Sequence, residues 1–245
     1  MVFQRKNERN HRTRNMSVVT LLIIPILILS ACSGNSDNNN NAKDNSNNNS
    51  KNKNTAFKVV IDPGHGGKDN GATGASGQYE KSFTLRLSKE VKKLLEQESG
   101  MEVFMTRTDD SFISQESRYR PKYANKLNAD VYVSIHGNTF SNPSVSGTET
   151  FYYHNNSRQF ARILQKHVVE ATGFRDRGIK KKDLFVVRDT NMPAALIEVG
   201  YLTNPENESV MRTDDFQSRV AASIVEGIKA YKERSDEQGF LNWGF

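Results

Sequence analysis

The fold is indicated most clearly by residues 59–67, which read Val-Val-Ile-Asp-Pro-Gly-His-Gly-Gly. Three branched apolar residues predict a buried strand, and the Pro-Gly pair predicts a turn at its end. Two further strands of this kind are predicted at 131–136 and 194–199, and each is followed by a glycine. Strands that are apolar over most of their length are typical of a sheet that helices bury on both faces.

Short β-branched or aromatic runs alternate with amphipathic stretches over the rest of the chain. The predicted strands are Lys58–Asp62, Met101–Arg107, Val131–His136, Thr148–Tyr153, Leu184–Val187 and Ala194–Val199. The predicted helices are 82–98, 156–172 and 214–232, and a further helix over 111–127 is interrupted by Pro121. This alternation predicts one α/β domain over residues 56–234 with helices covering a largely buried sheet, followed by a C-terminal tail at 235–245.

Residues 1–31 have the layout of a lipoprotein signal peptide. A basic stretch leads into the apolar run 18–29, which is too short for a helix that crosses about 30 Å of hydrocarbon. The junction at 29–32, Leu-Ser-Ala-Cys, resembles a bacterial lipobox and predicts that Cys32 is lipidated. The alternative is ordinary cleavage near Ala31, which would release a soluble protein. We expect a lipid-anchored protein on the outer side of the cell membrane, in the cell envelope.

Residues 33–54 consist almost wholly of Asn, Ser, Lys and Asp and cannot form a core. We interpret 32–55 as the lipidated cysteine and a flexible tether. The net charge of +6 is concentrated in residues 1–32, which carry +4 and leave +2 for the remainder. Because the excess charge belongs to the targeting segment, it gives no support to a nucleic-acid partner. Cys32 is the only cysteine, so the chain has no internal disulfide.

Two histidines and a glutamate are candidate metal ligands. His65 lies between glycines after the first strand, and His136 closes a buried strand. The ordinary alternatives are a loop histidine without function and a hydrogen-bonded core histidine. Glu80 precedes a long helix, where the helix dipole also favours an acid. The glycines at 64–67 do not form a phosphate loop, because no Gly-Lys-Ser/Thr element follows. Two histidines and one glutamate would leave the fourth position of a tetrahedral zinc ion open.

Glu198 is the candidate acid/base. It interrupts the apolar run 194–199, and burying its carboxylate without compensation would be costly. A metal-activated water or a reacting group would supply that compensation, and a buried ion pair with an arginine is the alternative. Zinc can acidify water and polarise a carbonyl, and a second carboxylate must then carry the proton to the leaving nitrogen.

Six motifs together resemble the zinc-dependent N-acetylmuramoyl-L-alanine amidases of the Amidase_3 family. They are Ile61–Gly67, Glu80, Arg107–Asp109, Ser134–Asn138, Arg177-Gly178 and Pro193–Asn204. The resemblance covers roughly residues 57–232. It implies a single mixed, mostly parallel sheet of about six strands flanked by helices on both faces. It also implies cleavage of the amide bond between N-acetylmuramic acid and the L-alanine of the peptidoglycan stem peptide.

The resemblance implies roles for individual residues. His65, Glu80 and His136 match the zinc ligands, and Glu198 matches the catalytic acid/base. Asn138 matches a residue near the substrate.

Two arginines also match recurring family positions. Arg107 and Arg118 are interpreted either as substrate contacts or as structural ion-pair residues. Thr139 departs from the alanine that the family often has there, which could alter the cleft.

Three other functions compete with the amidase. The first is a catalytically silent lipoprotein that binds peptidoglycan or regulates a partner. The second is a zinc hydrolase that cuts a peptide bond within the stem, and the third is a solute-binding lipoprotein, a class that is usually longer and two-lobed. The presence of all four key residues favours the amidase. We expect a monomer. No inhibitory insertion is evident between His136 and Glu198. An unidentified protein activator is a further hypothesis.

Overall fold

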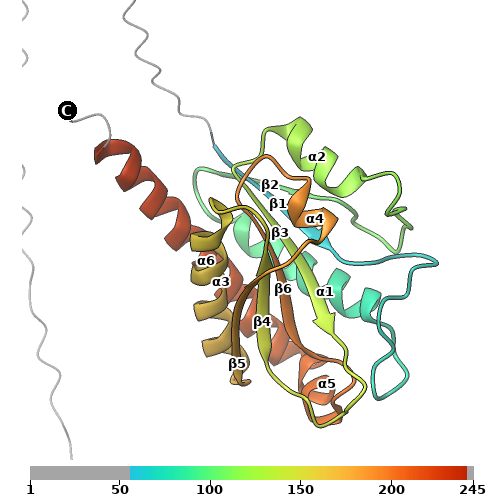
Figure 1. Cartoon of the computed structure of the whole chain (residues 1–245). Helices are drawn as coiled ribbons and strands as arrows, with labels where there is room; N and C mark the ends of the chain where they lie inside the picture. The colour runs from blue at the N-terminus through green and yellow to red at the C-terminus, as the bar shows by residue number, and fades with distance from the viewer. Residues whose placement is uncertain (1–55, 242–245) are drawn as a thin grey trace, which may run out of the picture. The chain divides into compact units, whose positions relative to one another are not determined.

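A six-stranded sheet forms the centre of residues 56–241, the part of the chain that the computed structural model describes (Figure 1). The strands are β1 (Phe57–Pro63), β2 (Met101–Met105), β3 (Val131–Asn138), β4 (Thr148–Tyr152), β5 (Asp176–Lys181) and β6 (Ala194–Tyr201). Their order across the sheet is β2-β1-β3-β6-β4-β5, and only β4 and β6 pair antiparallel. The predicted mixed, mostly parallel sheet is confirmed.

Helices cover both faces of this sheet (Figure 1). They are α1 (Glu80–Leu95), α2 (Tyr119–Leu127), α3 (Ser157–Thr172), α4 (Phe185–Arg188), α5 (Pro205–Met211) and α6 (Asp214–Leu241). On one face α1 and α3 pack against the sheet and against α6, whereas the shorter α2 and α4 lie on the other face. None of these described helices combines the length and the apolar composition that crossing a membrane requires.

The alternation of side chains along the strands creates two cores. Val59 and Ile61 enter the larger core beneath α1, α3 and α6, whereas Val60 enters the smaller core beneath α2 and α4. The larger core takes one stripe of α1, whose fully or almost fully buried apolar residues are Phe83, Leu87, Val91 and Leu95. Burial of each such side chain contributes about 1.5–3 kcal/mol. The core therefore fixes the orientation of α1, whose first residue is Glu80.

The structure corrects one predicted strand. Leu184–Val187 is not a strand, because Phe185–Arg188 form the short helix α4 and Leu184 precedes it. The fifth strand is β5, whose sequence Asp-Arg-Gly-Ile-Lys-Lys shows little hydrophobicity. It lies at the edge of the sheet, where one side remains free and charged residues are tolerated.

Two helix boundaries also differ from the prediction. Helix α2 begins at Tyr119, so Pro121 lies in its first turn, where its missing N–H is not needed. Helix α6 continues to Leu241 without a break at residue 234, so part of the predicted tail is helical. The predicted signal peptide, the lipidation site Cys32 and the tether lie outside the described residues.

Candidate metal and catalytic site

His65 lies in a tight turn that directly follows β1. Its backbone is left-handed (φ 62°), which is uncommon for a residue other than glycine and requires support from neighbouring contacts. The preceding residue, Gly64, packs against His136, and a Cβ at Gly64 would lie 2.3 Å from that imidazole. Glycine at this position therefore allows the two imidazole rings to approach, and their centroids are 5.0 Å apart.

Two buried arginines hold the carbonyl groups of this turn. Arg107 donates from Nε to the oxygen of Pro63 at 3.1 Å and from Nη2 to that of Gly64 at 2.8 Å. Arg120 donates to the carbonyl oxygens of Pro63 and His65 at 2.7 and 2.6 Å. Together the two arginines bind three successive carbonyl oxygens and so hold the backbone that carries His65 in place.

Asp62 supplies the negative charge beneath this pair of arginines. The carboxylate is fully buried, pairs with Arg120 at 2.5 Å and accepts hydrogen bonds from the hydroxyls of Thr106, Tyr132 and Ser134. Burial alone would raise its pKa, but Arg120 and the three hydroxyls outweigh burial and hold the pKa of Asp62 at about 2. The charge is therefore retained inside the protein at neutral pH.

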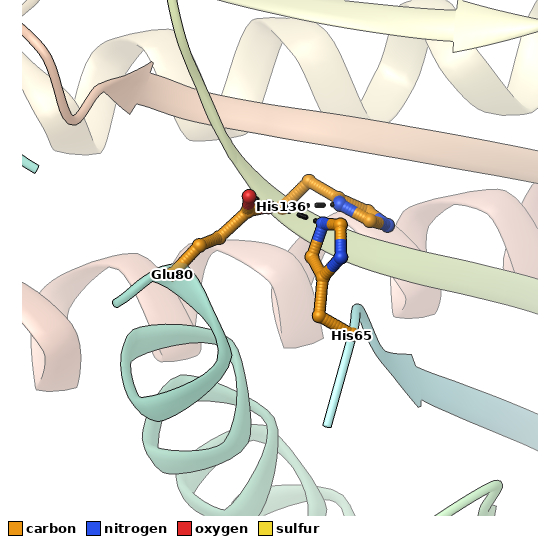
Figure 2. A group of neighbouring side chains, drawn as sticks. All are labelled: His65, Glu80 and His136. Carbon is orange, nitrogen blue, oxygen red and sulfur yellow. Dashed lines mark hydrogen bonds and ion pairs between the residues drawn. The ribbon is translucent and has the colours of Figure 1, made fainter. Parts of the chain in front are cut away.

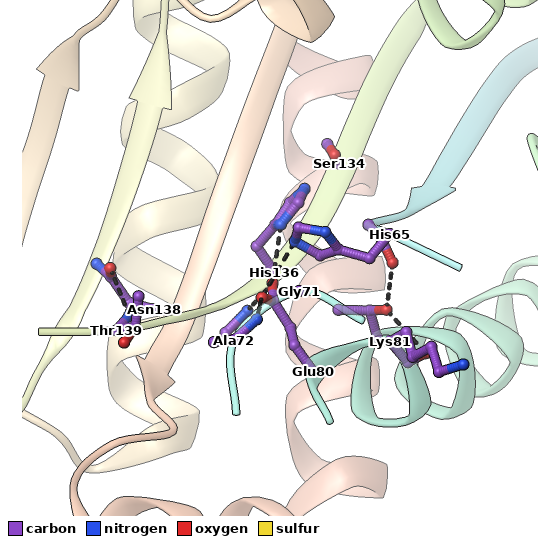
Figure 3. A network of polar contacts seen from close by, with 12 residues as sticks. His65, Gly71, Ala72, Glu80, Lys81, Ser134, His136, Asn138 and Thr139 are labelled. Atoms are coloured by element: carbon purple, nitrogen blue, oxygen red, sulfur yellow. Dashed lines mark hydrogen bonds and ion pairs between the residues drawn. The ribbon is translucent and has the colours of Figure 1, made fainter. Parts of the chain in front are cut away.

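Glu80 is the first residue of α1, and its carboxylate faces both histidines (Figure 3). Its Oε2 accepts the N–H of Ala72 at 2.8 Å, and its Oε1 accepts the N–H of Gly137 at 3.1 Å. Burial opposes its ionisation, but hydrogen bonds from His136 and His65 outweigh burial and lower the pKa of Glu80 well below its usual range. A helix N-terminus also favours a negative charge.

The side chains of His65, Glu80 and His136 converge on one point (Figure 2). His65 Nε2 lies 3.1 Å from Glu80 Oε2, and His136 Nδ1 lies 2.9 Å from Glu80 Oε1. All three candidate ligand atoms lie within 4.8 Å of one another. The structure thus brings together the three residues that the sequence predicts as metal ligands.

The second nitrogen of His65 is held by a carboxylate that the sequence analysis missed. His65 Nδ1 lies 2.8 Å from Asp69 Oδ1, which also accepts the N–H of Gly71. Although burial alone would lower it, hydrogen bonds to Glu80 and Asp69 raise the pKa of His65 to about 9. The carboxylates of Glu80 and Asp69 therefore favour a positive charge at His65. A carboxylate behind a ligand histidine is the usual support in metal sites, and two imidazoles with one carboxylate suit zinc.

Glu198 lies beside this group on the neighbouring strand. In the register of β3 and β6 it pairs with His136, and in the register of β6 and β4 it pairs with Glu149. Within residues 56–241 its Oε2 is buried without a hydrogen-bond partner. Burial, followed by the charges of Glu80 and Glu149, raises the pKa of Glu198 to about 8. The predicted acid/base therefore combines an available oxygen with a pKa suited to proton exchange near neutrality.

Glu149, on β4, is a second carboxylate beside Glu198 on β6, and the sequence analysis missed it. It is buried, and its Oε1 accepts hydrogen bonds from Asn138 Nδ2 at 2.5 Å and from the Tyr201 hydroxyl at 2.9 Å. Lys180 contacts its Oε2. Burial alone would raise its pKa, but Lys180 and Tyr201 outweigh burial and lower the pKa of Glu149. The neighbouring carboxylates thus favour opposite protonation states.

The structure places the predicted substrate residues close to the site but not among its ligands. Asn138 is bonded to Glu149, and Figure 3 shows it apart from the two histidines. Arg107 is almost fully buried, and most of its hydrogen bonds go to main-chain carbonyls, which favours a structural role. Within residues 56–241 it forms no ion pair. Contact of either residue with substrate stays a prediction.

Arg118, for which an ion-pair role is predicted, pairs with Asp189 near the surface, and the buried ion pair of this region is formed by Arg120 and Asp62. Arg118 is exposed at the start of α2, with its guanidinium 4.5 Å from the ring centroid of Phe185 and 3.9 Å from Asp189.

A cavity of about 190 Å³ opens beside the two histidines. Its apolar wall is formed by Ile113, Leu184 and Phe185, so the segment wrongly predicted as a strand lines the site. An apolar wall next to a few convergent polar groups is typical of sites for organic ligands.

Comparison with known proteins assigns the family. The sequence profile described as N-acetylmuramoyl-L-alanine amidase (Amidase_3) matches residues 59–230. The chain belongs to the Amidase_3 family. The match includes every residue of the site described above, and it ends before the last turns of α6.

Individual relatives agree with this family assignment. "Probable cell wall amidase LytH" of Staphylococcus aureus is 35% identical over 184 residues, which are 74% of this chain and 60% of that protein. The catalytic domain of CwlV, an N-acetylmuramoyl-L-alanine amidase from Bacillus (Paenibacillus) polymyxa var. colistinus, is 45% identical with a TM-score of 0.70 and covers 72% of this chain and 98% of its own.

A third relative was solved with a partner. The CwlD amidase of Clostridioides difficile, in complex with the GerS lipoprotein, is 28% identical with a TM-score of 0.67 and covers 72% of this chain and 98% of its own.

Three supporting residues were missed for different reasons. Asp69 lies four residues after His65 in a loop whose path the sequence does not define. Arg120 lies in the uncertain helix region, and only its pairing with Asp62 across the fold reveals its role. Glu149 stands between two threonines in β4, where a charged residue is compatible with an ordinary strand.

Proposed function

We propose that this chain is a zinc-dependent N-acetylmuramoyl-L-alanine amidase that cleaves the bond between N-acetylmuramic acid and L-alanine in peptidoglycan. One observation carries the proposal: two imidazoles and a carboxylate lie within 4.8 Å of one another, beside a glutamate whose buried oxygen has no hydrogen-bond partner in the described part of the chain. Membership of the Amidase_3 family and the descriptions of its relatives support the choice of bond.

His65, Glu80 and His136 would hold the zinc ion. Their donor set leaves an open position, as in catalytic rather than structural zinc sites. When bound, zinc supplies Lewis acidity, which makes water a stronger nucleophile near neutral pH and polarises a carbonyl. Asp69 fixes the ring of His65 through Nδ1, and the arginine pair fixes its backbone.

Glu198 would move the proton. In this role its carboxylate takes a proton from the attacking water and delivers it to the nitrogen of L-alanine as the amide bond breaks. Two features support this role: Glu198 lies beside His136 across β3 and β6, and its Oε2 accepts no hydrogen bond from the residues that the structure describes. Glu149 stays ionised nearby, and its charge helps to raise the pKa of Glu198, which makes the Glu198 carboxylate a stronger base toward water.

The same proposal includes export and anchoring in the cell envelope. Cleavage before Cys32 and lipidation of its thiol would attach the protein to the membrane, and residues 33–54 would let the catalytic domain reach the wall. We propose that the protein acts as a monomer on the polymer. The complex of the related CwlD with a lipoprotein makes a protein activator a reasonable addition to test.

The decisive test of activity is mass spectrometry of purified peptidoglycan after incubation with the full chain in detergent. Zinc-loaded protein should release stem peptides that begin with alanine and leave peptide-free glycan. Chelator-treated protein and the Glu198→Gln variant are the matched negative controls. Peptides cut at an internal stem bond would replace the amidase with a peptidase, and an intact wall that co-sediments with the protein would favour a binding function.

Anchoring is tested by fractionation of cells that produce the wild-type chain or its Cys32→Ser variant. The wild type should carry two acyl chains and sediment with membranes, and the variant should not. Release of unmodified wild-type protein into the medium would instead indicate ordinary cleavage near Ala31.

A further inference from the structure

A cationic ledge flanks the site on the side away from the histidines. It consists of Arg177, Lys180 and Lys182, in or directly after the edge strand β5. Lys180 pairs with Phe151 in the register of β4 and β5 and contacts Glu149. Lys182 lies with its Nζ 4.4 Å from the ring centroid of Phe151. The ledge therefore lies next to the paired carboxylates Glu149 on β4 and Glu198 on β6.

Arg177 is held in position before any ligand binds. Its guanidinium lies 5.3 Å from the ring centroid of Tyr201, and its stem packs against Gly147, where a Cβ would lie 2.6 Å from its Cδ and Cγ. Its Nε is 3.9 Å from Glu149, beyond hydrogen-bond distance, and among the described residues this buried atom has no hydrogen-bond partner. A rigid guanidinium with unused donors is suited to bind a carboxylate.

The charges of this region do not balance without a further anion. Arg177 and Lys180 both lie against the single carboxylate of Glu149, and Lys182 lies over the ring of Phe151 two residues further along β4. Lys180 and Lys182 are exposed, so their charges remain accessible from solvent. The surplus positive charge thus lies beside the acid/base.

The order of the strands gives the cleft a direction. His65 and His136 follow β1 and β3, Glu198 lies on the next strand, β6, and the ledge lies beyond β4. Under the proposed function, the scissile carbonyl lies at the histidines and the leaving nitrogen lies at Glu198. The peptide that carries this nitrogen must then extend over β4 and β5.

We propose that the cationic ledge binds a carboxylate of the stem peptide, and that the enzyme therefore prefers stems with a free carboxylate near the alanine to stems in which it is amidated. This inference rests on the proposed function. A charge-assisted contact at a partly exposed site corresponds to about a tenfold preference. Because the lysines are exposed, the preference should weaken as ionic strength rises.

The test uses the zinc-loaded full chain and two synthetic muropeptides that differ only at the second stem residue, which bears a free carboxylate or a carboxamide. We expect a kcat/KM about tenfold higher for the acid, mainly through KM. Lys182→Met should lower kcat/KM for the acid toward the value for the amide, and Arg177→Met should do so further. The matched control is Lys166→Met, because Lys166 is an exposed residue of α3, which packs on the opposite face of the sheet.

The outcomes separate this inference from the proposed function. Equal cleavage of the two muropeptides by the wild type would overturn the ledge as a carboxylate site and leave the amidase intact. A preference that survives both Lys182→Met and Arg177→Met would overturn it as well. Cleavage of neither muropeptide would overturn the proposed function and the ledge with it. Lys182 is exposed, so its variant still tests the ledge if Arg177→Met fails to fold.

Discussion

The histidine side of the site and its acid/base side lie on adjacent strands but are built differently. On the histidine side, Glu80 accepts hydrogen bonds from two main-chain N–H groups and faces both imidazoles. Arg107 and Arg120 donate hydrogen bonds to the main-chain carbonyls of the turn that carries His65. On the acid/base side, Glu198 keeps one buried oxygen without a partner among residues 56–241.

This difference agrees with the proposed division between residues that hold a metal ion and a residue that transfers protons. A group that must keep three ligand atoms in place benefits from neutralised charges and from contacts to rigid backbone. A group that exchanges protons needs instead an available oxygen. Its protonated and ionised forms must also be close in free energy. Changes on the histidine side should therefore affect stability and metal affinity, whereas changes at Glu198 should affect turnover alone.

The largest effect is expected for Glu198→Gln. The amide keeps the shape of the side chain but cannot carry the proton, so kcat should fall about 10³- to 10⁴-fold. The free energy of unfolding should change by less than about 1 kcal/mol, because the buried oxygen makes no hydrogen bond to any of residues 56–241. Muropeptide kinetics and urea unfolding measure the two quantities, with the exposed Glu206→Gln as control. A kcat like that of the wild type would remove Glu198 from the mechanism.

Asp62→Asn should produce the largest loss of stability. It leaves the buried guanidinium of Arg120 without its counter-charge, and breaking a buried pair in this way costs about 3–5 kcal/mol. Urea unfolding of the variant measures this loss. Asp110→Asn, which breaks the more exposed pair with Lys81, is the matched control and should cost far less. Equal losses in the two variants would show that the Asp62 network does not brace the turn.

Asp69→Asn should weaken metal binding while leaving the fold intact. Without the carboxylate behind His65 Nδ1, zinc affinity should fall about 10- to 100-fold. Competition with a chelator of known affinity measures it. Glu198→Gln serves as the control that keeps wild-type affinity, and an unchanged affinity in Asp69→Asn would mean that the ring of His65 is held by other contacts.

The smallest effect is a pH dependence of stability. The pKa of Asp62 is about 2 in the folded protein and 3.8 ordinarily, so its stabilising contribution is complete above about pH 4 and is lost as pH falls toward 2. Between pH 5 and pH 3 the wild type should lose about 1 kcal/mol more than Asp62→Asn. Parallel losses in unfolding experiments would contradict the lowered pKa.

The sequence predicts the residues of the site better than the contacts that support them. His65, His136 and Glu198 each stand in a motif that their local residues define, whereas Glu80 is assigned through the family resemblance. The structure brings these residues together. Asp69, Arg120 and Glu149 matter only through partners that folding brings near, up to 58 residues away in the case of Arg120 and Asp62. No local pattern marks such contacts.

The fold shows the same limit. Apolar strands such as β1, β3 and β6 are evident because burial on both faces demands hydrophobic residues. Strand β5 escapes detection because the sheet edge permits charges, and α4 is mistaken for a strand because four residues are too few for a helical period to appear.

The most direct test of the account measures zinc content and amide cleavage on the same preparations of the wild type, Glu80→Gln and Glu198→Gln. We predict one zinc ion per chain and cleavage for the wild type, loss of both for Glu80→Gln, and one zinc ion without cleavage for Glu198→Gln. Loss of zinc from Glu198→Gln, or cleavage by zinc-free Glu80→Gln, would contradict the division between a metal-holding side and a proton-moving side.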